Sequence, residues 1–494
     1  MNNPSFRNSP ADFLPEGMLS AVCPGLIFTS PNAVQITEAT RWADRGAGVV
    51  HVVKNYTGDV MNFRVARQAL AAEGVSTREV RVAEDVATES AGDEGPGRRG
   101  TAATILVEKV AGAAAQRGDS LDRVVEIAQW VADHSRSMAV ALAPGHLPTS
   151  GNKTFDLGSG QMEVGVGIHG ERGTSREAIS PAAEVVDRLL GEIVCSLGLE
   201  RGEEVIFLVN GLGGTSSLEL HLLFGQAAAW LERHGITIRR SLVGNYVTAL
   251  NMAGASLTLA RTTEEIVDLI DAPTTAPAWP RSLGSGDRYS PAVLRAEDAL
   301  STDGPDNAWL SDFVRRVQEG TGVLTDLDRL AGDGDFGTNM DAALGDLPLP
   351  LRGEDAAVLG GLSRRFLIRS GGTSGAVLGT LFRELAAASD GSARGLALGL
   401  RRGCEAIAEL GGAQRGDGTL LDALLPAAEE AGRQAEIGAN LDEALGEAYR
   451  AALAGAESTR EIVARKGRAA YVGEASCGVM DPGALLATWL FGGN

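Results

Sequence analysis

The chain has 494 residues, of which 44% are hydrophobic and 22% charged, and its formal net charge is −20. This length is enough for about two to four domains with buried cores. The negative charge argues against nucleic acid or an anionic membrane as a partner, because binding either needs a basic surface.

The N-terminal residues "MNNPSFRNSPADFLPEG" have neither the basic nor the apolar region of a signal peptide. No apolar run reaches the length of about 18 residues that a membrane-spanning helix needs. The four cysteines are far apart and form no CxxC pair, so neither a disulfide framework nor a zinc site is predicted. We therefore expect a cytoplasmic protein.

Residues 20–270 alternate short β-branched runs with stretches of helical periodicity. The runs "AGVVHVVKN", "EEVIFLVNG" and "ASLTLA" predict strands. "DSLDRVVEIAQWVADHSRS" and "PAAEVVDRLLGEIVCSLG" predict helices between them. This alternation indicates an α/β domain over residues 1–270. The glycine-rich tract 87–104 is predicted to be a mobile loop.

A change in composition at residue 271 marks a second region. "DAPTTAPAWPRSLGSGDRYSP" replaces periodic apolar residues with Pro, Ser, Gly and Thr, which predicts a linker over 271–300. Residues 301–494 are rich in Ala, Leu, Glu and Arg, with glycine-rich loops between the helical stretches. We expect a multidomain protein whose second domain is all-α and carries chemistry in its loops.

The loop "LDRLAGDGDFGTN" places Asp328, Asp333 and Asp335 close together in sequence. Carboxylates this close repel one another, and the glycines between them allow the chain to turn so that they converge. Mg²⁺ prefers such oxygen ligands and often shares them with substrate phosphates. A solvated turn is the alternative. The EF-hand pattern does not fit, because its twelfth-position Glu is absent.

Three further loops strengthen the metal hypothesis. "RSGGTSGAVLG" enters a helix with small residues, a form that offers main-chain N–H groups to a phosphate, although close helix packing explains it equally well. "GGAQRGDGTLLDAL" repeats this form, and "RKGRAAYVGEASCGVMDPGAL" ends in a "DPGA" helix start. Together with the aspartates, these loops suggest a Mg-nucleotide site on a helical scaffold.

In this order, the four motifs resemble the nucleotide-binding L-type domain of the dihydroxyacetone (glycerone) kinase family. The resemblance implies a barrel of antiparallel helices in which Asp328, Asp333 and Asp335 bind Mg²⁺ and ATP. It implies phosphate contacts at Thr373 and Ser374. It also implies nucleotide contacts at Phe336, Gly337, Thr338, Asn339, Gly411, Leu420, Arg468, Asp481, Pro482 and Gly483. The chain departs from the family motifs at Phe336, Gly418, Leu420, Ala475 and Val479.

Five segments of the first half resemble the substrate-binding K-type domain of the same family: "GMLSAVCPGLIFTSP", "VVKNYTGDVMNF", "GRRGTAATILVEKVAGAAA", "MEVGVGIHGERG" and "LVNGLGGTSSLEL". The resemblance implies that His169 holds a small hydroxyketone covalently, that Asp59 is the general base and that Lys54 belongs to the same site. We expect the His169 ring to be exposed above a turn that ends a strand. Without the motif, a histidine bonded to local backbone groups is the simpler interpretation. Dimers are usual in the family, so a homodimer is expected.

The start of the chain departs from this family. Family members begin with a further strand and a glycine loop that ends in a histidine, and the position of that histidine falls near Phe6. A misassigned start, a degenerate or regulatory homologue, and a site retuned to another carbonyl substrate remain as explanations.

Three functions are therefore open. The first is ATP-dependent phosphorylation of dihydroxyacetone or a related hydroxyketone. The second is a regulatory homologue that binds nucleotide or a carbonyl metabolite. The third is a lyase activity that cyclises FAD.

Overall fold

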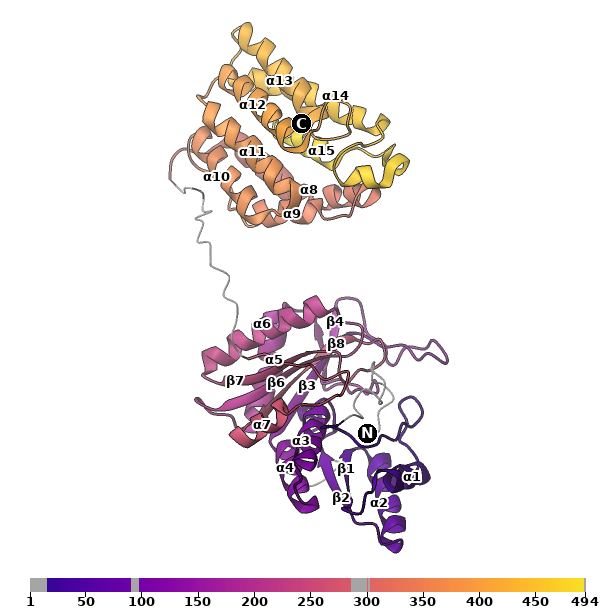
Figure 1. The fold of residues 1–494 in the computed structure, drawn as a ribbon. Coiled ribbons are helices and arrows are strands. Elements are labelled where there is room, and N and C mark those ends of the chain that lie inside the picture. Colours follow the sequence, from indigo (N-terminus) through magenta and orange to yellow (C-terminus); the bar gives the residue numbers. More distant parts are fainter. Residues whose placement is uncertain (1–15, 90–96, 286–299, 301–302, 493–494) are drawn as a thin grey trace. The chain divides into compact units, whose positions relative to one another are not determined.

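The structure is a computed structural model that describes residues 16–89, 97–285, 300 and 303–492, except for the side chains at positions 468, 471, 472 and 475. The chain forms two compact units, residues 1–291 and 292–494, which are described separately below. Their helices and strands are labelled in Figure 1.

The first unit contains a mixed six-stranded sheet with the order β5-β4-β3-β8-β6-β7. Only β6 and β7 are parallel neighbours, and the other pairs are antiparallel. The strands are β3 (Ser135–Ala143), β4 (Gln161–Val164), β5 (Ser175–Ala178), β6 (Glu204–Gly211), β7 (Thr237–Gly244) and β8 (Ala253–Arg261). Alternate side chains of β6 and β8 enter two different apolar cores, so the sheet is covered on both faces.

Helices α5 (Ala182–Leu197) and α6 (Ser217–His234) contribute to one of these cores. Helices α3 (Thr104–Arg117), α4 (Leu121–Asp133) and α7 (Glu264–Asp271) contribute to the other. The predicted α/β class of this half is confirmed, and the three quoted strand runs and two quoted helix runs all form as expected.

A small parallel sheet lies next to α3 and α4, and it carries part of the candidate site. It consists of β1 (Val49–Lys54) and β2 (Thr77–Val82). The helices α1 (Ala33–Ala43) and α2 (Thr57–Ala72) cover its other face, where Val53 and Phe63 are buried together. Successive side chains of a strand point to opposite faces. The β-branched residues of β1 therefore pack against a layer of helices on each face of the small sheet.

Two expectations for the first unit need correction. The predicted mobile loop 87–104 is buried in its last part, where Arg99 and Thr101 pack in the interior and Thr104 begins α3. Residues 90–96 lie outside the described residues. Residues 272–285, expected to belong to a linker, pack on the first unit, where Ala276 and Trp279 join the core. The linker prediction considered the Pro and Thr content of this segment. It did not consider the free energy gained by burying the large apolar side chain of Trp279.

In residues 303–492, the described part of the second unit, the regular elements are all helical, which confirms the predicted class. The α-helices are α8 (Ala308–Ala331), α9 (Phe336–Leu344), α10 (Asp355–Arg369), α11 (Gly372–Ala388), α12 (Ala393–Gly411), α13 (Leu421–Glu436), α14 (Leu441–Ser458) and α15 (Pro482–Trp489). Helices that follow one another pack together along most of the chain, and α15 also packs against α8. This contact closes the bundle around one apolar core.

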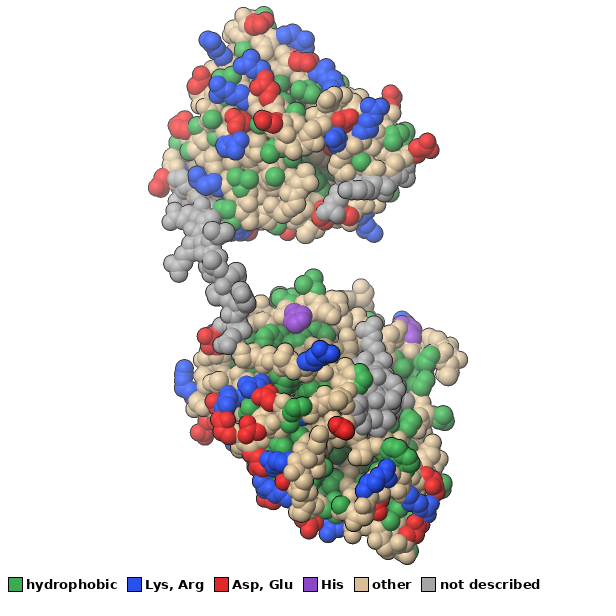
Figure 2. All heavy atoms as spheres, viewed as in Figure 1, with side chains coloured by type: hydrophobic (Ala, Val, Ile, Leu, Met, Phe, Trp, Pro, Cys, Tyr) green, Lys and Arg blue, Asp and Glu red, His purple; other side chains and the backbone are tan. Residues whose placement is uncertain are grey.

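No helix among the described residues is both long and apolar enough to cross a bilayer. Acidic and basic side chains are interspersed on the visible face of each unit (Figure 2).

Candidate active site

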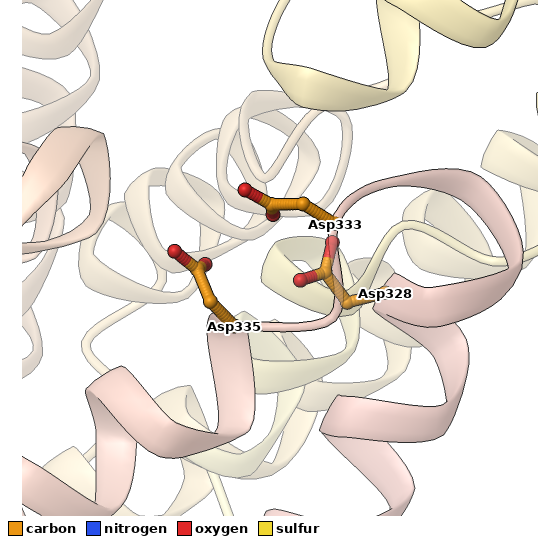
Figure 3. A group of neighbouring side chains, drawn as sticks. All are labelled: Asp328, Asp333 and Asp335. Atoms are coloured by element: carbon orange, nitrogen blue, oxygen red, sulfur yellow. The ribbon is translucent and has the colours of Figure 1, made fainter. Parts of the chain in front are cut away.

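The three predicted metal ligands converge at the end of α8 (Figure 3). Asp328 lies in the last turn of α8 and is buried, whereas Asp333 and Asp335 are exposed on the loop that leads to α9. One carboxylate oxygen from each residue lies within 4.8 Å of the others.

Local hydrogen bonds hold the aspartate loop in this shape. The Phe336 main-chain N–H donates to Asp328 Oδ2 at 3.0 Å, and the Asn339 side chain donates to Asp335 Oδ1 at 3.1 Å. Gly334 has a φ of +77°, a left-handed conformation that favours glycine. The loop is therefore fixed at both ends while Asp333 and Asp335 face outward.

The electrostatics of the cluster suit a divalent cation. Burial raises the pKa of Asp328, and the charges of Asp333 and Asp335 raise it further. The hydrogen bond from the Phe336 main-chain N–H lowers the same pKa but does not outweigh these effects. A cation such as Mg²⁺ would relieve this repulsion, since it prefers hard carboxylate ligands and keeps sites for phosphate oxygens. The donor set fits Mg²⁺.

A cavity of about 470 Å³ opens beside the cluster. Of the nucleotide contacts predicted from the sequence, those that line it are Phe336, Asn339, Thr373, Ser374, Gly411, Leu420, Asp481, Pro482 and Gly483. Gly337 and Thr338 do not line it. Gly337 instead packs on α8, where a Cβ atom would lie 2.1 Å from Thr325 Oγ1. The side chain of Arg468 lies outside the described part of the chain.

The start of α11 forms one wall of this cavity. Thr373 and Ser374 occupy its first turn, and Gly371 at the N-cap leaves the helix without a side-chain cap. The first N–H groups of such a helix have no partner within it, so they are available to an anion. Gly375 allows the turn to approach Ser370, whose carbonyl oxygen would lie 1.9 Å from a Cβ atom at residue 375.

Other parts of the cavity wall were missed at the sequence level. Lys466 lines the cavity and supplies a positive charge. The only feature of the sequence that could have pointed to it is the rarity of lysine, since the chain contains four. Ile407, Leu410 and Met480 give an apolar surface of the kind that a nucleobase requires. Burial raises the pKa of Asp481 to about 7, with the charge of Asp422 adding to the effect.

In the first unit, Lys54 and Asp59 come from one short segment of the chain and are brought together with His169 from a second. Lys54 ends β1 and is buried, and Asp59 lies buried in the first turn of α2. Burial raises the pKa of Asp59, while the Ser30 hydroxyl and the charges of Lys54 and His169 lower it. Burial likewise lowers the pKa of Lys54.

His169 is held by a carboxylate two residues further along the chain. Its Nδ1 lies 3.0 Å from Glu171 Oε1, and its main-chain N–H donates to Glu171 Oε2 at 2.9 Å. Burial raises the pKa of Glu171, but the hydrogen bond and charge of His169 and the nearby charge of Arg99 outweigh it and lower the pKa to about 2. An ionised Glu171 can only accept hydrogen bonds, so in the neutral form of the His169 ring Nδ1 carries the proton and Nε2 the lone pair.

The position of His169 differs from the expectation in two respects. The strand predicted to lead into it ends at Val164, because Gly165 turns with a φ of +78°. The ring is not fully exposed, since 19% of the His169 side chain is accessible. It lies edge-on to Phe28 and Tyr56, with ring centroids 5.5 and 4.7 Å away.

Sequence reasoning missed Ser30, Phe28, Tyr56 and Glu171. Tyr56 and Glu171 lie within the quoted motifs beside Asp59 and His169, so proximity was the available signal. Phe28 and Ser30 lie within the first of the quoted K-type segments, and the φ of +56° at Phe28 is rare for a residue with a side chain.

Comparison with known proteins identifies the family of each half of the chain. The Dak1 domain family matches residues 9–278, and the DAK2 domain family matches residues 330–493. The chain belongs to the family of ATP-dependent dihydroxyacetone and triose kinases. The family and the predicted enzyme class are therefore confirmed.

Two curated relatives extend over nearly the whole chain. The triokinase/FMN cyclase of Bos taurus is 36% identical over 97% of this chain and 86% of its own length. The L-erythrulose 1-kinase of Mycolicibacterium smegmatis is 34% identical over 93% of this chain and 85% of its own length.

Solved structures show similarity at the level of the fold as well. The dihydroxyacetone kinase from C. freundii in complex with AMP-PNP and Mg²⁺ is 28% identical, with a TM-score of 0.56 over 99% of this chain and 88% of that one. A dihydroxyacetone kinase operon co-activator is 30% identical, with a TM-score of 0.54 over 56% of this chain and 86% of that one.

Proposed function

We propose that this protein transfers the γ-phosphate of ATP to dihydroxyacetone or a related small hydroxyketone such as erythrulose. The observation that carries the proposal is the pairing of His169 with Glu171 beside the buried Asp59. This arrangement suits a carbonyl substrate, and the three aspartates of the second unit suit its phosphate donor.

His169 would hold the ketose covalently through Nε2. The Nε2 lone pair attacks the carbonyl carbon, the C–N bond forms, and the carbonyl π bond opens. The oxygen gains a proton as the ring gives up its Nδ1 proton, so a neutral hemiaminal results. Glu171 lies at hydrogen-bond distance from Nδ1 and is placed to receive or relay that proton. Phe28 and Tyr56 limit the space around the ring to small substrates.

Asp59 would take the proton from the hydroxyl that attacks phosphorus. Its burial raises its pKa, which makes its carboxylate a stronger base than an exposed one. In the second unit, Asp328, Asp333 and Asp335 would hold Mg²⁺, which neutralises charge on the phosphate oxygens. Thr373, Ser374 and the α11 N–H groups would bind the phosphates, and Ile407, Leu410 and Met480 would contact the base.

The experiment is a measurement of ADP release from Mg-ATP with a panel of C3 to C5 ketoses. We expect turnover with at least one of them and its loss in His169→Ala. Turnover no greater than that of His169→Ala with every ketose would reject the kinase proposal. Thermal stabilisation by ATP that survives in that case, but is lost in Asp333→Ala, would instead indicate a regulatory homologue.

A second activity is FAD cyclisation, favoured by the similarity to the triokinase/FMN cyclase of Bos taurus. A ribityl hydroxyl of FAD would attack the phosphorus on the flavin side, and AMP would leave. The aspartate cluster would hold the metal for both reactions. Release of AMP from FAD, unchanged in His169→Ala but lost in Asp333→Ala, is the expected result. The homodimer and the cytoplasmic location stay predictions.

A further inference from the structure

Arg99 is a buried arginine beside the proposed ketose site to which the proposed reaction gives no role. The Arg99 side chain is 11% exposed, and that of its ion-pair partner Asp85 is 3% exposed. The main-chain N–H groups of Glu84 and Asp85 both donate to the Arg99 carbonyl oxygen at 3.0 Å, which ties the two segments together. Burial of a charged side chain costs free energy unless hydrogen bonds and an opposite charge compensate it. The contacts of Arg99 therefore need an explanation.

Two nitrogen atoms of the Arg99 guanidinium are held by acceptors. Nε and Nη2 lie 2.8 and 2.6 Å from Asp85 Oδ2, and Nη2 also donates to the Gly165 carbonyl oxygen at 2.9 Å. The other oxygen of Asp85, Oδ1, accepts from the Ala87 main-chain N–H at 3.1 Å, so this carboxylate is itself held. A guanidinium is planar and rigid, so bonds along one edge also fix the direction of its third nitrogen, Nη1.

The third nitrogen lies beside Glu171, the residue that holds His169. A Cβ atom at Gly167 would be 2.6 Å from Arg99 Nη1 and 2.0 Å from Glu171 Oε2, so the two side chains meet at this glycine. Gly167 does not have a left-handed φ, so it is space and not backbone conformation that calls for glycine here. The charge of Arg99 is also one of the effects that keep the pKa of Glu171 low.

A purely structural role for Arg99 explains only part of this arrangement. Gly165 is the residue at which the chain turns away from β4 toward His169, and Asp85 follows β2. Nε and Nη2 are sufficient to join these two segments. The placement of Nη1 next to the Glu171 carboxylate adds nothing to that connection, and it indicates a second role.

We propose that Arg99 is a positioning residue of the ketose site, which holds the Glu171 carboxylate against His169 and so keeps Nε2 of the ring available to attack a carbonyl carbon. This inference rests on the proposed function, because it assigns Arg99 to the capture of a ketose by His169. Nδ1 keeps its proton as long as Glu171 is in place to accept a hydrogen bond from it. Arg99 acts through Glu171 and not on the substrate itself.

Replacement of Arg99 by lysine tests this role. Lysine keeps the charge but lacks the planar fork, so one ammonium group cannot bond to Asp85 and Gly165 and also face Glu171. We expect the affinity for dihydroxyacetone to fall by about 10- to 100-fold, because the nucleophile is no longer held in position. The affinity for Mg-ATP should be unchanged, since its proposed site belongs to the other unit.

Arg98→Lys is the matched control. Arg98 also donates to a main-chain carbonyl, that of Ala83, and also forms an ion pair, with Glu89. These contacts are away from the His169 loop, so Arg98→Lys should bind dihydroxyacetone as the parent protein does. Equal ketose affinity in Arg99→Lys and Arg98→Lys would overturn the proposal.

Capture of the ketose can be measured without turnover. In ¹³C NMR of dihydroxyacetone labelled at its carbonyl carbon, the signal moves when that carbon becomes tetrahedral in the hemiaminal. If Arg99 acts through Glu171, Arg99→Lys should weaken capture by less than about twofold when Glu171→Gln is already present. A fall by the same factor in both backgrounds would show that Arg99 only supports the fold, and would overturn the proposal.

The tautomer of the His169 ring tests Arg99 even if no ketose binds. Absence of an adduct in the parent protein would reject the proposed function alone. The ¹⁵N shifts of the ring should still report a proton on Nδ1 in the parent and a population with the proton on Nε2 in Arg99→Lys. If that variant does not fold, Gly167→Ala keeps Arg99 but displaces Glu171 Oε2, and it should change the tautomer in the same way. An unchanged tautomer in the folded variant would overturn the proposal.

Discussion

Replacement of Glu171 by glutamine tests the covalent role of His169. The Glu171 carboxylate accepts two hydrogen bonds, from His169 Nδ1 and from the His169 main-chain N–H. A glutamine has one acceptor and one donor, so it can satisfy only one of them. If its oxygen keeps the main-chain bond, its NH₂ group faces Nδ1. The ring must then place its proton on Nε2 and loses the nucleophilic lone pair.

The magnitude follows from the bond that is lost. A hydrogen bond to a charged group contributes about 1.5–3 kcal/mol. At about 1.4 kcal/mol per factor of ten, this corresponds to a fall of about 10- to 150-fold in kcat/KM for the ketose. The fall should lie mainly in the ketose KM, because the proposed ATP site belongs to the other unit.

Initial-rate kinetics with dihydroxyacetone, together with ¹⁵N shifts of the His169 ring, measure this effect. The shifts should report a proton on Nδ1 in the parent protein and on Nε2 in Glu171→Gln. Glu184→Gln, an exposed acid on α5, controls for loss of charge. Ketose kinetics in Glu171→Gln that match those of the control would refute the reasoning, and so would an unchanged tautomer.

Three further outcomes follow from the same geometry. As the pH falls, kcat/KM should drop at a pH above the usual range of carboxyl pKa values, because the base must be ionised and burial raises the pKa of Asp59. Asp59→Asn should abolish turnover. Asp333→Ala should remove the stabilisation by Mg-ATP, about 2.7 kcal/mol at 100 times Kd, whereas the exposed Asp326→Ala should keep it in thermal melts. Gly375→Ala should destabilise the protein by about 1–3 kcal/mol in denaturant titration and weaken ATP binding, since its Cβ would contact the Ser370 carbonyl.

The fold class and the metal cluster could be predicted because each depends on short-range patterns. The sequence pattern of strand β1 and that of helix α5 are each visible within one short stretch of the chain. Asp328, Asp333 and Asp335 lie within eight residues, so one glycine-rich turn is sufficient to bring them together. Phe6, where the family histidine would lie, is outside the described residues.

The parts that could not be predicted depend on contacts between distant segments. Phe28 and His169 both lie in quoted K-type segments, but the sequence does not show that they are in contact across some 140 residues. Trp279 and Thr101 lie in stretches whose composition is typical of loops, yet both are buried. Burial of such residues is decided by the layers packed around them, which composition does not report.

The ketose site also concentrates buried charge in a way that packing alone does not explain. Lys54, Asp59, Glu84 and Glu108 are all less than 5% exposed. Burial lowers the pKa of Lys54 and raises those of the three carboxyls, so each group loses stability in its charged form. Apolar residues of similar volume would usually be no less stable here. Asp59 has a catalytic use in the proposed reaction, and the charge of Glu108 offsets that of the buried Lys54.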